Sequence, residues 1–327
     1  MDLVQLRRFL VAAEAGNLRR AAARLHVSQP ALTQSIKGLE LRLGVDLFDR
    51  SARGVTLTRF GTALVPRARM MLNERERIAR DLEEIRSERS ARISVGVGPY
   101  FIHQLFPSAV LRTLERFPTA KISVTVGQTV QLMNRLQEGI LDCAFCVHNP
   151  AIDTDPGLEF ADTHEERYSV MARSGHPLSR RKRVTDKDVS DCTWIVYDAD
   201  GGPDYLTRSF AERGIPVPRW AIATASLPLM TSLISKSDLV GIMPDIYVRS
   251  EIAAGRLVRL VGHSLEVRGR GGILTRKSRV HGPTTRELIV NLRGVCAEAQ
   301  AQAQKPAGHA RPAAHTITAM RQEVTSP

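Results

Sequence analysis

The sequence predicts an α/β protein with three parts: a mostly helical N-terminal domain, one long helix, and a larger C-terminal domain of two lobes. Three observations predict this order. Short helices crowd residues 1–60, an apolar residue recurs at every seventh position within 58–89, and buried strands alternate with helices over 92–303. A chain of 327 residues also exceeds what one core usually organises, so we expect more than one domain.

The charge of the chain indicates a polyanionic partner. Its formal net charge is +12, and residues 1–60 hold ten Lys or Arg against five Asp or Glu. No apolar run reaches the roughly 18 residues of a membrane span, and the charged N-terminus shows no signal peptide. Four cysteines at irregular spacing fit a reduced compartment better than a disulfide framework. We therefore expect a cytoplasmic protein with no membrane partner.

The first forty-four residues predict three short helices. The apolar spacing over 3–14 is that of an amphipathic helix, and Gly16 is a natural left-handed stop. Asn17 can cap a second helix, and Ser28, with Pro30 in the following turn, can begin a third. Two helices joined by a tight turn form a helix-turn-helix.

Two segments follow this helical unit. Residues 47–61 hold two short extended pieces around Gly54 and predict a β-wing. A long helix then fits 58–89, with Thr58 as its cap. Its apolar seam predicts a coiled coil that joins two chains through Leu64, Met71, Ile78, Leu82 and Ile85. The alternative is a helix that packs on its own domain.

From residue 92 the pattern is that of two α/β lobes. Strands near 92–97, 121–126 and 142–147 alternate with helices at 102–117 and 129–138, which predicts a parallel βαβαβ unit. Lobe one covers about 92–162 and 268–303, and lobe two covers about 163–267. Expected strands of the second set lie at 167–173, 193–198, 220–224, 239–244, 257–261 and 268–275, with helices at 203–213, 226–236 and 283–303. Residues 305–327 lose all periodicity and predict a disordered tail.

The N-terminal sixty residues resemble the LysR-type transcriptional regulators. The residues that carry the resemblance are LRRFLVAAEAGNLRRAAARLHVSQPALTQSIKGLELRLGVDLFDR, followed by VTLTRFG. The resemblance implies a winged helix-turn-helix, a dimerising linker helix, and an effector domain shaped like a periplasmic binding protein. It further implies a homodimer or homotetramer that binds dyad-symmetric sites on double-stranded DNA and responds to a small metabolite. RNA polymerase is a further partner that the resemblance suggests.

The third helix carries a polar cluster at its start, where a recognition helix meets the major groove. Glutamine amides can bond adenine edges, and the threonine methyl can meet a thymine methyl. Basic side chains here and in the wing would neutralise phosphates. The alternative is an ordinary solvated face. We assign DNA contact to Gln29, Pro30, Thr33, Gln34, Lys37, Arg50 and Arg53.

Ligands of doubly wound sheets bind beyond the carboxyl ends of the strands. Three such ends in lobe one, and two loops of lobe two at 198–203 and 224–227, predict an effector cleft. Thr129 opens a helix, where an anion is favoured, and Tyr100 can stack on the ligand, which suggests a small organic acid with an aromatic body. The alternatives are a plain helix cap and a surface aromatic. The expected contacts are Pro99, Tyr100, Gln128, Thr129, Val147, His148, Asp200, Gly202 and Ser226.

Other chemistries find little support in the sequence. Cys143 and Cys146 lie three apart on a predicted strand, so they point to opposite faces and cannot easily share a metal. We expect no metal, no cofactor and no catalytic site, because no nucleophile–base motif occurs. A transport-type binding protein and an α/β enzyme remain as other function classes for residues 92–300, and the N-terminal helix-turn-helix argues for a regulator.

Overall fold

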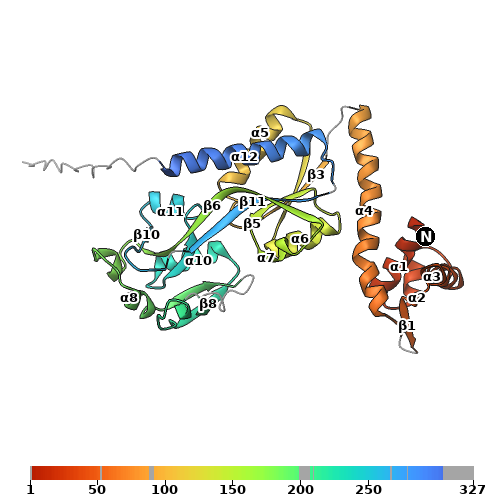
Figure 1. The fold of residues 1–327 in the computed structure, drawn as a ribbon, viewed down its shortest axis with the longest axis horizontal. Helices are drawn as coiled ribbons and strands as arrows, with labels where there is room; N and C mark the ends of the chain where they lie inside the picture. The colour runs from red at the N-terminus through yellow and green to blue at the C-terminus, as the bar shows by residue number, and fades with distance from the viewer. Residues whose placement is uncertain are drawn as a thin grey trace, which may run out of the picture.

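The structure is a computed structural model, and it describes residues 2–51, 54–87, 92–198, 207–208, 210–265, 267–277 and 279–304. A long helix stands between a small N-terminal domain and a larger α/β domain (Figure 1). The elements of the N-terminal part are α1 (Leu3–Ala15), α2 (Leu18–Arg24), α3 (Gln29–Leu43), β1 (Phe48–Ser51), β2 (Gly54–Leu57) and α4 (Arg59–Ser87).

The predicted caps of the N-terminal helices are confirmed. Gly16 ends α1 with φ 62°, and the Asn17 side chain accepts hydrogen bonds from the backbone N–H groups of Arg19 and Arg20. Ser28 Oγ accepts from Ala31 N at 3.3 Å. These bonds satisfy N–H groups that have no partner inside their helices, so the helix boundaries are fixed locally.

The predicted wing is confirmed as an antiparallel pair, in which Phe48 faces Leu57 and Ser51 faces Gly54. Gly54 has φ 133°, and a Cβ there would lie 2.4 Å from the backbone oxygen of Gly16. Only glycine fits such an approach. The wing therefore lies directly against the turn that follows α1.

Helix α4 is divided between two environments. Thr58 Oγ1 accepts from Gly61 N at 3.1 Å and caps the helix, as predicted. Ala68 is fully buried against the N-terminal core and Leu64 is partly buried there, so this part follows the alternative reading. Further along, the seam residues stay exposed: Met71 by 40%, Ile78 by 54% and Leu82 by 61%. The side chain of Ile85 lies outside the described structure.

The C-terminal domain is built around one mixed sheet. Its elements are β3 (Arg92–Val97), α5 (Leu105–Arg116), β4 (Lys121–Val126), α6 (Thr129–Gln137), β5 (Cys143–Val147), α7 (Pro150–Asp153), β6 (Leu158–Arg173), η1 (Pro177–Arg180), α8 (Asp186–Ser190), β7 (Trp194–Tyr197), β8 (Trp220–Thr224), α10 (Leu227–Lys236), β9 (Gly241–Pro244), α11 (Arg249–Ala253), β10 (Leu257–Arg259), β11 (Val267–Arg276) and α12 (Pro283–Gln304). The strand order is β10-β6-β11-β5-β3-β4, and β9 also pairs with β6. The predicted parallel unit is confirmed, because β3 runs parallel to both β4 and β5.

Strands β6 and β11 connect the two lobes. Strand β6 begins at Leu158, nine residues before the predicted start at 167, and it pairs antiparallel with β11 from Leu158 to Tyr168. Only Leu158, His164 and Glu166 are buried in the missed part, so it lacks the apolar pattern of a buried strand, and its strand character depends on pairing with the distant β11. The lobes therefore share a continuous ladder. Of the helix predicted at 203–213, residues 207, 208, 210 and 211 are helical, and 203–206 and 209 lie outside the described residues. The tail 305–327 also lies outside them.

A buried ion network joins α4 to lobe one. Arg77 is 2% exposed, and its guanidinium donates to the backbone oxygens of Gly139 (2.9 Å) and Leu141 (3.2 Å). It also lies 3.0 Å from the carboxylate of Asp142, which Arg279 contacts as well. Two guanidiniums thus share one buried carboxylate.

Removal of this carboxylate charge should destabilise the C-terminal domain. Asp142→Asn removes the buried counter-charge that Arg77 and Arg279 share and leaves Arg77 only the half-buried Glu74, which costs about 3–5 kcal/mol. Both tryptophans of the chain, Trp194 and Trp220, lie in this domain, so urea unfolding followed by tryptophan fluorescence measures the loss. The exposed Asp191→Asn should change the free energy of unfolding by less than about 0.5 kcal/mol. Equal stability of the two variants would contradict a stabilising role for the network.

Candidate functional site

Helix α3 presents the predicted DNA-contacting side chains on its outer face. Its inner face is buried through Leu32, Ile36 and Leu39. Of the predicted contacts on the helix, Thr33 is half-buried, and the exposed members are Gln29, Pro30, Gln34 and Lys37. The structure therefore brings these side chains together on a surface that is free for a partner.

The wing arginine is held by a buried carboxylate. Glu40 is 8% exposed, and its Oε1 accepts from the backbone N–H groups of Leu47 (3.0 Å) and Phe48 (3.3 Å). Its Oε2 lies 3.0 Å from the guanidinium of Arg50. Glu40 thus fixes the start of the wing and the direction of Arg50, a role that helix periodicity alone does not reveal. Arg53 lies outside the described residues.

A cavity of about 320 Å³ lies at the ends of β3, β4 and β5. Six of the predicted effector contacts line it: Pro99, Tyr100, Gln128, Thr129, Val147 and His148. Residues from lobe two form the opposite wall, among them Trp194, Ile195 and Tyr197. The structure thus brings the three predicted strand ends of lobe one together and closes them with strand β7.

We call this cavity the effector cavity after the predicted contacts that line it, and the start of α6 forms one of its polar walls. Gln128 occupies the N-cap position, so Thr129 is the first helical residue and not the cap. Thr129 is 6% exposed, and its hydroxyl donates to the backbone oxygen of Val147 at 2.8 Å. Its lone pairs remain available as acceptors. The Gln128 amide donates to the Tyr197 hydroxyl at 2.7 Å, which joins the two lobes across the cavity.

Three tyrosines surround the same space. The ring centroid of Tyr100 lies 5.8 Å from that of Tyr168, nearly perpendicular, and 5.6 Å from that of Tyr197. The first contact is edge-to-face and the second is tilted, and such ring contacts hold the side chains in place. Sequence reasoning missed Tyr168 and Tyr197. Tyr197 ends a predicted strand and could have been found by the strand-end rule, whereas Tyr168 lies on β6, whose crossing between the lobes the sequence does not show.

One further predicted contact, Ser226, does not join the cavity. Ser226 is exposed, is absent from the lining, and caps α10 by accepting from Leu229 N at 3.3 Å. Asp200 and Gly202 lie outside the described residues. Cys143 and Cys146 form no disulfide, and they pack into two different apolar cores.

Among the described residues, no group of three or more His, Cys, Asp or Glu side chains could hold a metal ion. No helix within the same ranges combines the length and the apolar character that crossing a membrane requires.

Comparison with known proteins gives consistent relatives for both domains. Residues 3–62 match the model of the bacterial regulatory helix-turn-helix protein, lysR family, and residues 86–297 match the LysR substrate binding domain. The chain is 30% identical to the SDS degradation transcriptional activation protein of a Pseudomonas species, over 88% of this chain and 94% of that protein. It is 33% identical to the regulator TfdS of Cupriavidus pinatubonensis, over 68% of this chain and 72% of that protein.

Solved structures agree with these relatives. Full-length CbnR, determined in complex with its target DNA, matches with a TM-score of 0.63 and 25% identity, over 90% of this chain and all of that one. Both sequence models, which together cover most of the chain, belong to a single family. The chain is therefore a member of the LysR family of DNA-binding transcriptional regulators, which combine a helix-turn-helix with an effector-binding domain and are not enzymes.

Proposed function

We propose that this regulator responds to a small organic acid with an aromatic body, bound in the effector cavity between the lobes. The observation that carries the proposal is the convergence of Tyr100, Tyr168 and Tyr197 with the start of α6 around one cavity. The first N–H groups of a helix lack partners within it and attract a carboxylate. The tyrosine rings offer faces and edges to an aromatic body.

The ligand would act by favouring one arrangement of the lobes. Gln128 on α6 and Tyr197 on β7 already touch across the cavity, so a ligand beside them contacts both lobes at once. A ligand that binds two lobe arrangements with equal affinity leaves their populations unchanged. A ligand that contacts both lobes binds more tightly to the arrangement in which both sets of contacts are made.

The effector proposal predicts unequal effects of two threonine variants. Thr129→Val removes the hydroxyl and leaves the Val147 oxygen without its donor, so affinity for the inducing acid should fall about 5- to 100-fold. Thr129→Ser keeps the hydroxyl and should stay within about threefold of wild type. Calorimetric titration with a panel of aromatic and aliphatic acids measures both constants.

The matched control for this experiment is Ser226→Ala. It removes a helix cap worth about 0.5–2 kcal/mol of stability but lies outside the cavity, so inducer affinity should not change. The proposal fails if Thr129→Val binds the inducer as wild type does, or if Ser226→Ala loses as much affinity.

We further propose that α3 reads bases and that Lys37, Arg50 and Arg53 contact phosphates. The support is the exposure of the polar face of α3 beside a wing fixed by Glu40. The target is double-stranded DNA with a dyad-symmetric site. Because DNA lies in the cytoplasm of a bacterium, we place the protein there, with RNA polymerase as a further partner at the promoter.

Variants of α3 should separate contacts to DNA bases, which depend on sequence, from contacts to phosphates, which do not. Gln34→Ala should cost about 1–3 kcal/mol at an operator selected from a random pool, and little on random duplex, because only base contacts discriminate. Lys37→Ala should weaken both duplexes alike and reduce the salt slope by about 1. Lys187→Ala, an exposed lysine on α8, is the control in the gel shifts. Unchanged specificity in Gln34→Ala would refute the base-reading role.

We also propose that the exposed part of the α4 seam joins two chains into a dimer, which can assemble further into a tetramer. Met71, Ile78 and Leu82 present an apolar stripe that nothing covers within the described chain. A second α4 would bury it by knobs-into-holes packing. Two recognition helices would then meet half-sites about one helical turn apart, or a multiple of it.

Charges in this stripe should dissociate the chains. Met71→Glu combined with Ile78→Glu places four carboxylates in the dimer seam, so the mass measured by light scattering should fall and operator affinity should be lost. Ala79→Glu adds a carboxylate beside the stripe at an exposed position and should keep the wild-type mass. A double variant with wild-type mass would show that the chains associate elsewhere.

A further inference from the structure

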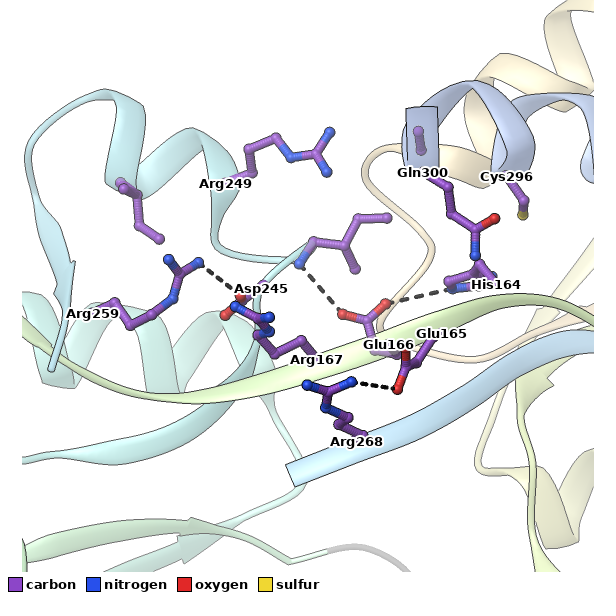
Figure 2. A pocket seen from close by; sticks show the side chains of 13 residues that line it. His164, Glu165, Glu166, Arg167, Asp245, Arg249, Arg259, Arg268, Cys296 and Gln300 are labelled. Atoms are coloured by element: carbon purple, nitrogen blue, oxygen red, sulfur yellow. Dashed lines mark hydrogen bonds and ion pairs between the residues drawn. The ribbon is translucent and has the colours of Figure 1, made fainter. Parts of the chain in front are cut away.

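A second cavity, of about 710 Å³, lies between the lobes and is distinct from the effector cavity. Figure 2 shows its walls: strands β6 and β11 form the floor, α11 of lobe two stands on one side, and α12 of lobe one stands on the other. Arg268 lines both cavities. Because residues of both lobes line the second cavity, a ligand bound there would contact both lobes without entering the effector cavity.

The charges of this cavity do not balance. Three of its cations face carboxylates: Arg259 lies 2.7 Å from Asp245, Arg268 lies 3.2 Å from Glu165, and His164 lies 3.5 Å from Glu166. Two more cations remain, Arg167 and Arg249. Both are exposed, and within the described ranges no carboxylate pairs with either of them. The lining thus carries an excess of two positive charges.

The floor of the cavity holds a buried ion pair that is loosely made. The side chains of His164 and Glu166 are 5% and 3% exposed. Burial lowers the pKa of His164, but the neighbouring Cys296 and Glu166 outweigh burial and raise it to about 9, so the ring is cationic near neutrality. The 3.5 Å separation from Glu166 exceeds the roughly 2.7–2.9 Å of a strong charged hydrogen bond.

An acceptor in the same cavity also lacks a donor. Asp245 Oδ2 accepts from Arg259 at 2.7 Å, whereas Oδ1 is buried and has no hydrogen-bond partner among the described residues. A buried oxygen without a donor is costly, and a hydroxyl group can satisfy it. The Gln300 amide of α12 adds a further polar group to the lining (Figure 2).

We propose that this cavity is a second ligand site for a small hydroxylated organic anion, whose charged group is held by Arg167 and Arg249 and whose hydroxyl donates to Asp245. The excess of two positive charges matches a phosphate monoester better than a single carboxylate, because guanidinium groups bind phosphate bidentately. The chemical class is thus that of sugar phosphates. Sugar acids are the nearest alternative, because they also combine an anionic group with hydroxyl groups.

The position of the site gives it a regulatory consequence. Its ligand would touch α11 and α12 at once and would bias the same lobe arrangement that the effector cavity senses. If the two ligands prefer the same arrangement, each raises the affinity of the other by the same factor. If they prefer different arrangements, each lowers it.

Calorimetry on the full-length protein tests the proposal with four probes: glucose 6-phosphate, gluconate, glucose and inorganic phosphate. Glucose 6-phosphate should bind wild type at least tenfold more tightly than the other three probes. Arg249→Gln should weaken that binding at least tenfold, as should Arg167→Gln. Arg293→Gln, an exposed arginine on α12 that does not line the cavity, should not change it. Circular dichroism checks that each variant is folded.

Each other outcome overturns a defined part of the proposal. If glucose 6-phosphate does not bind wild type, or binds Arg249→Gln unchanged, the site is wrong. If Thr129→Val abolishes this binding and Arg249→Gln does not, the ligand occupies the effector cavity. Equal affinity for inorganic phosphate and glucose 6-phosphate would refute the role of Asp245 as a hydroxyl acceptor, and tighter binding of gluconate would refute the phosphate class.

Discussion

The buried carboxylate of Asp142 is the point on which the arrangement of the chain depends. It accepts from the backbone N–H of Ser94 at 2.6 Å, lies 3.0 Å from Arg77 of α4, and contacts Arg279 before α12. Three segments far apart in sequence therefore meet at one charge. Removing charges from water is costly and is offset only when counter-charges and hydrogen-bond partners surround them, so the network restricts how these segments meet. The Nε groups of Arg77, Arg276 and Arg279 have no hydrogen-bond partner among the described residues.

The surroundings of this carboxylate show how the excess charge is limited. Among the described residues, Arg77, Arg276 and Arg279 face two carboxylates, Asp142 and Glu74, since Glu74 pairs with Arg77 at 3.1 Å and with Arg276 at 3.0 Å. Burial, followed by the charge of Arg279, lowers the pKa of nearby His281 to about 4, so its ring stays neutral. A further pair of contacts extends the connection, because Arg69 reaches both Glu14 of α1 and Glu138 after α6. Helix α4 is thereby fixed to both of its neighbours.

Local rules recovered much of this structure from the sequence. The caps at Asn17, Ser28 and Thr58 are set by hydrogen bonds within four residues, and the strand ends that line the effector cavity follow from parallel topology. Features that depend on distant partners were missed. The extended half of β6 is a strand only because β11 pairs with it, and Tyr168 reaches the cavity only because β6 crosses between the lobes. The second cavity joins β6 to α11 and α12, and no single stretch of sequence contains it.

The position of the effector cavity at the strand ends has a consequence for how such regulators diversify. The sheet is held by backbone hydrogen bonds and by apolar cores below the cavity, whereas the cavity itself is lined by side chains such as Tyr100, Gln128 and His148. Substitutions at these positions change the chemistry of the cavity and leave strand pairing and core packing intact. Gene duplication followed by exchange of a few cavity residues can therefore yield a sensor for a new metabolite, while the parent fold and its connection to α4 are inherited unchanged.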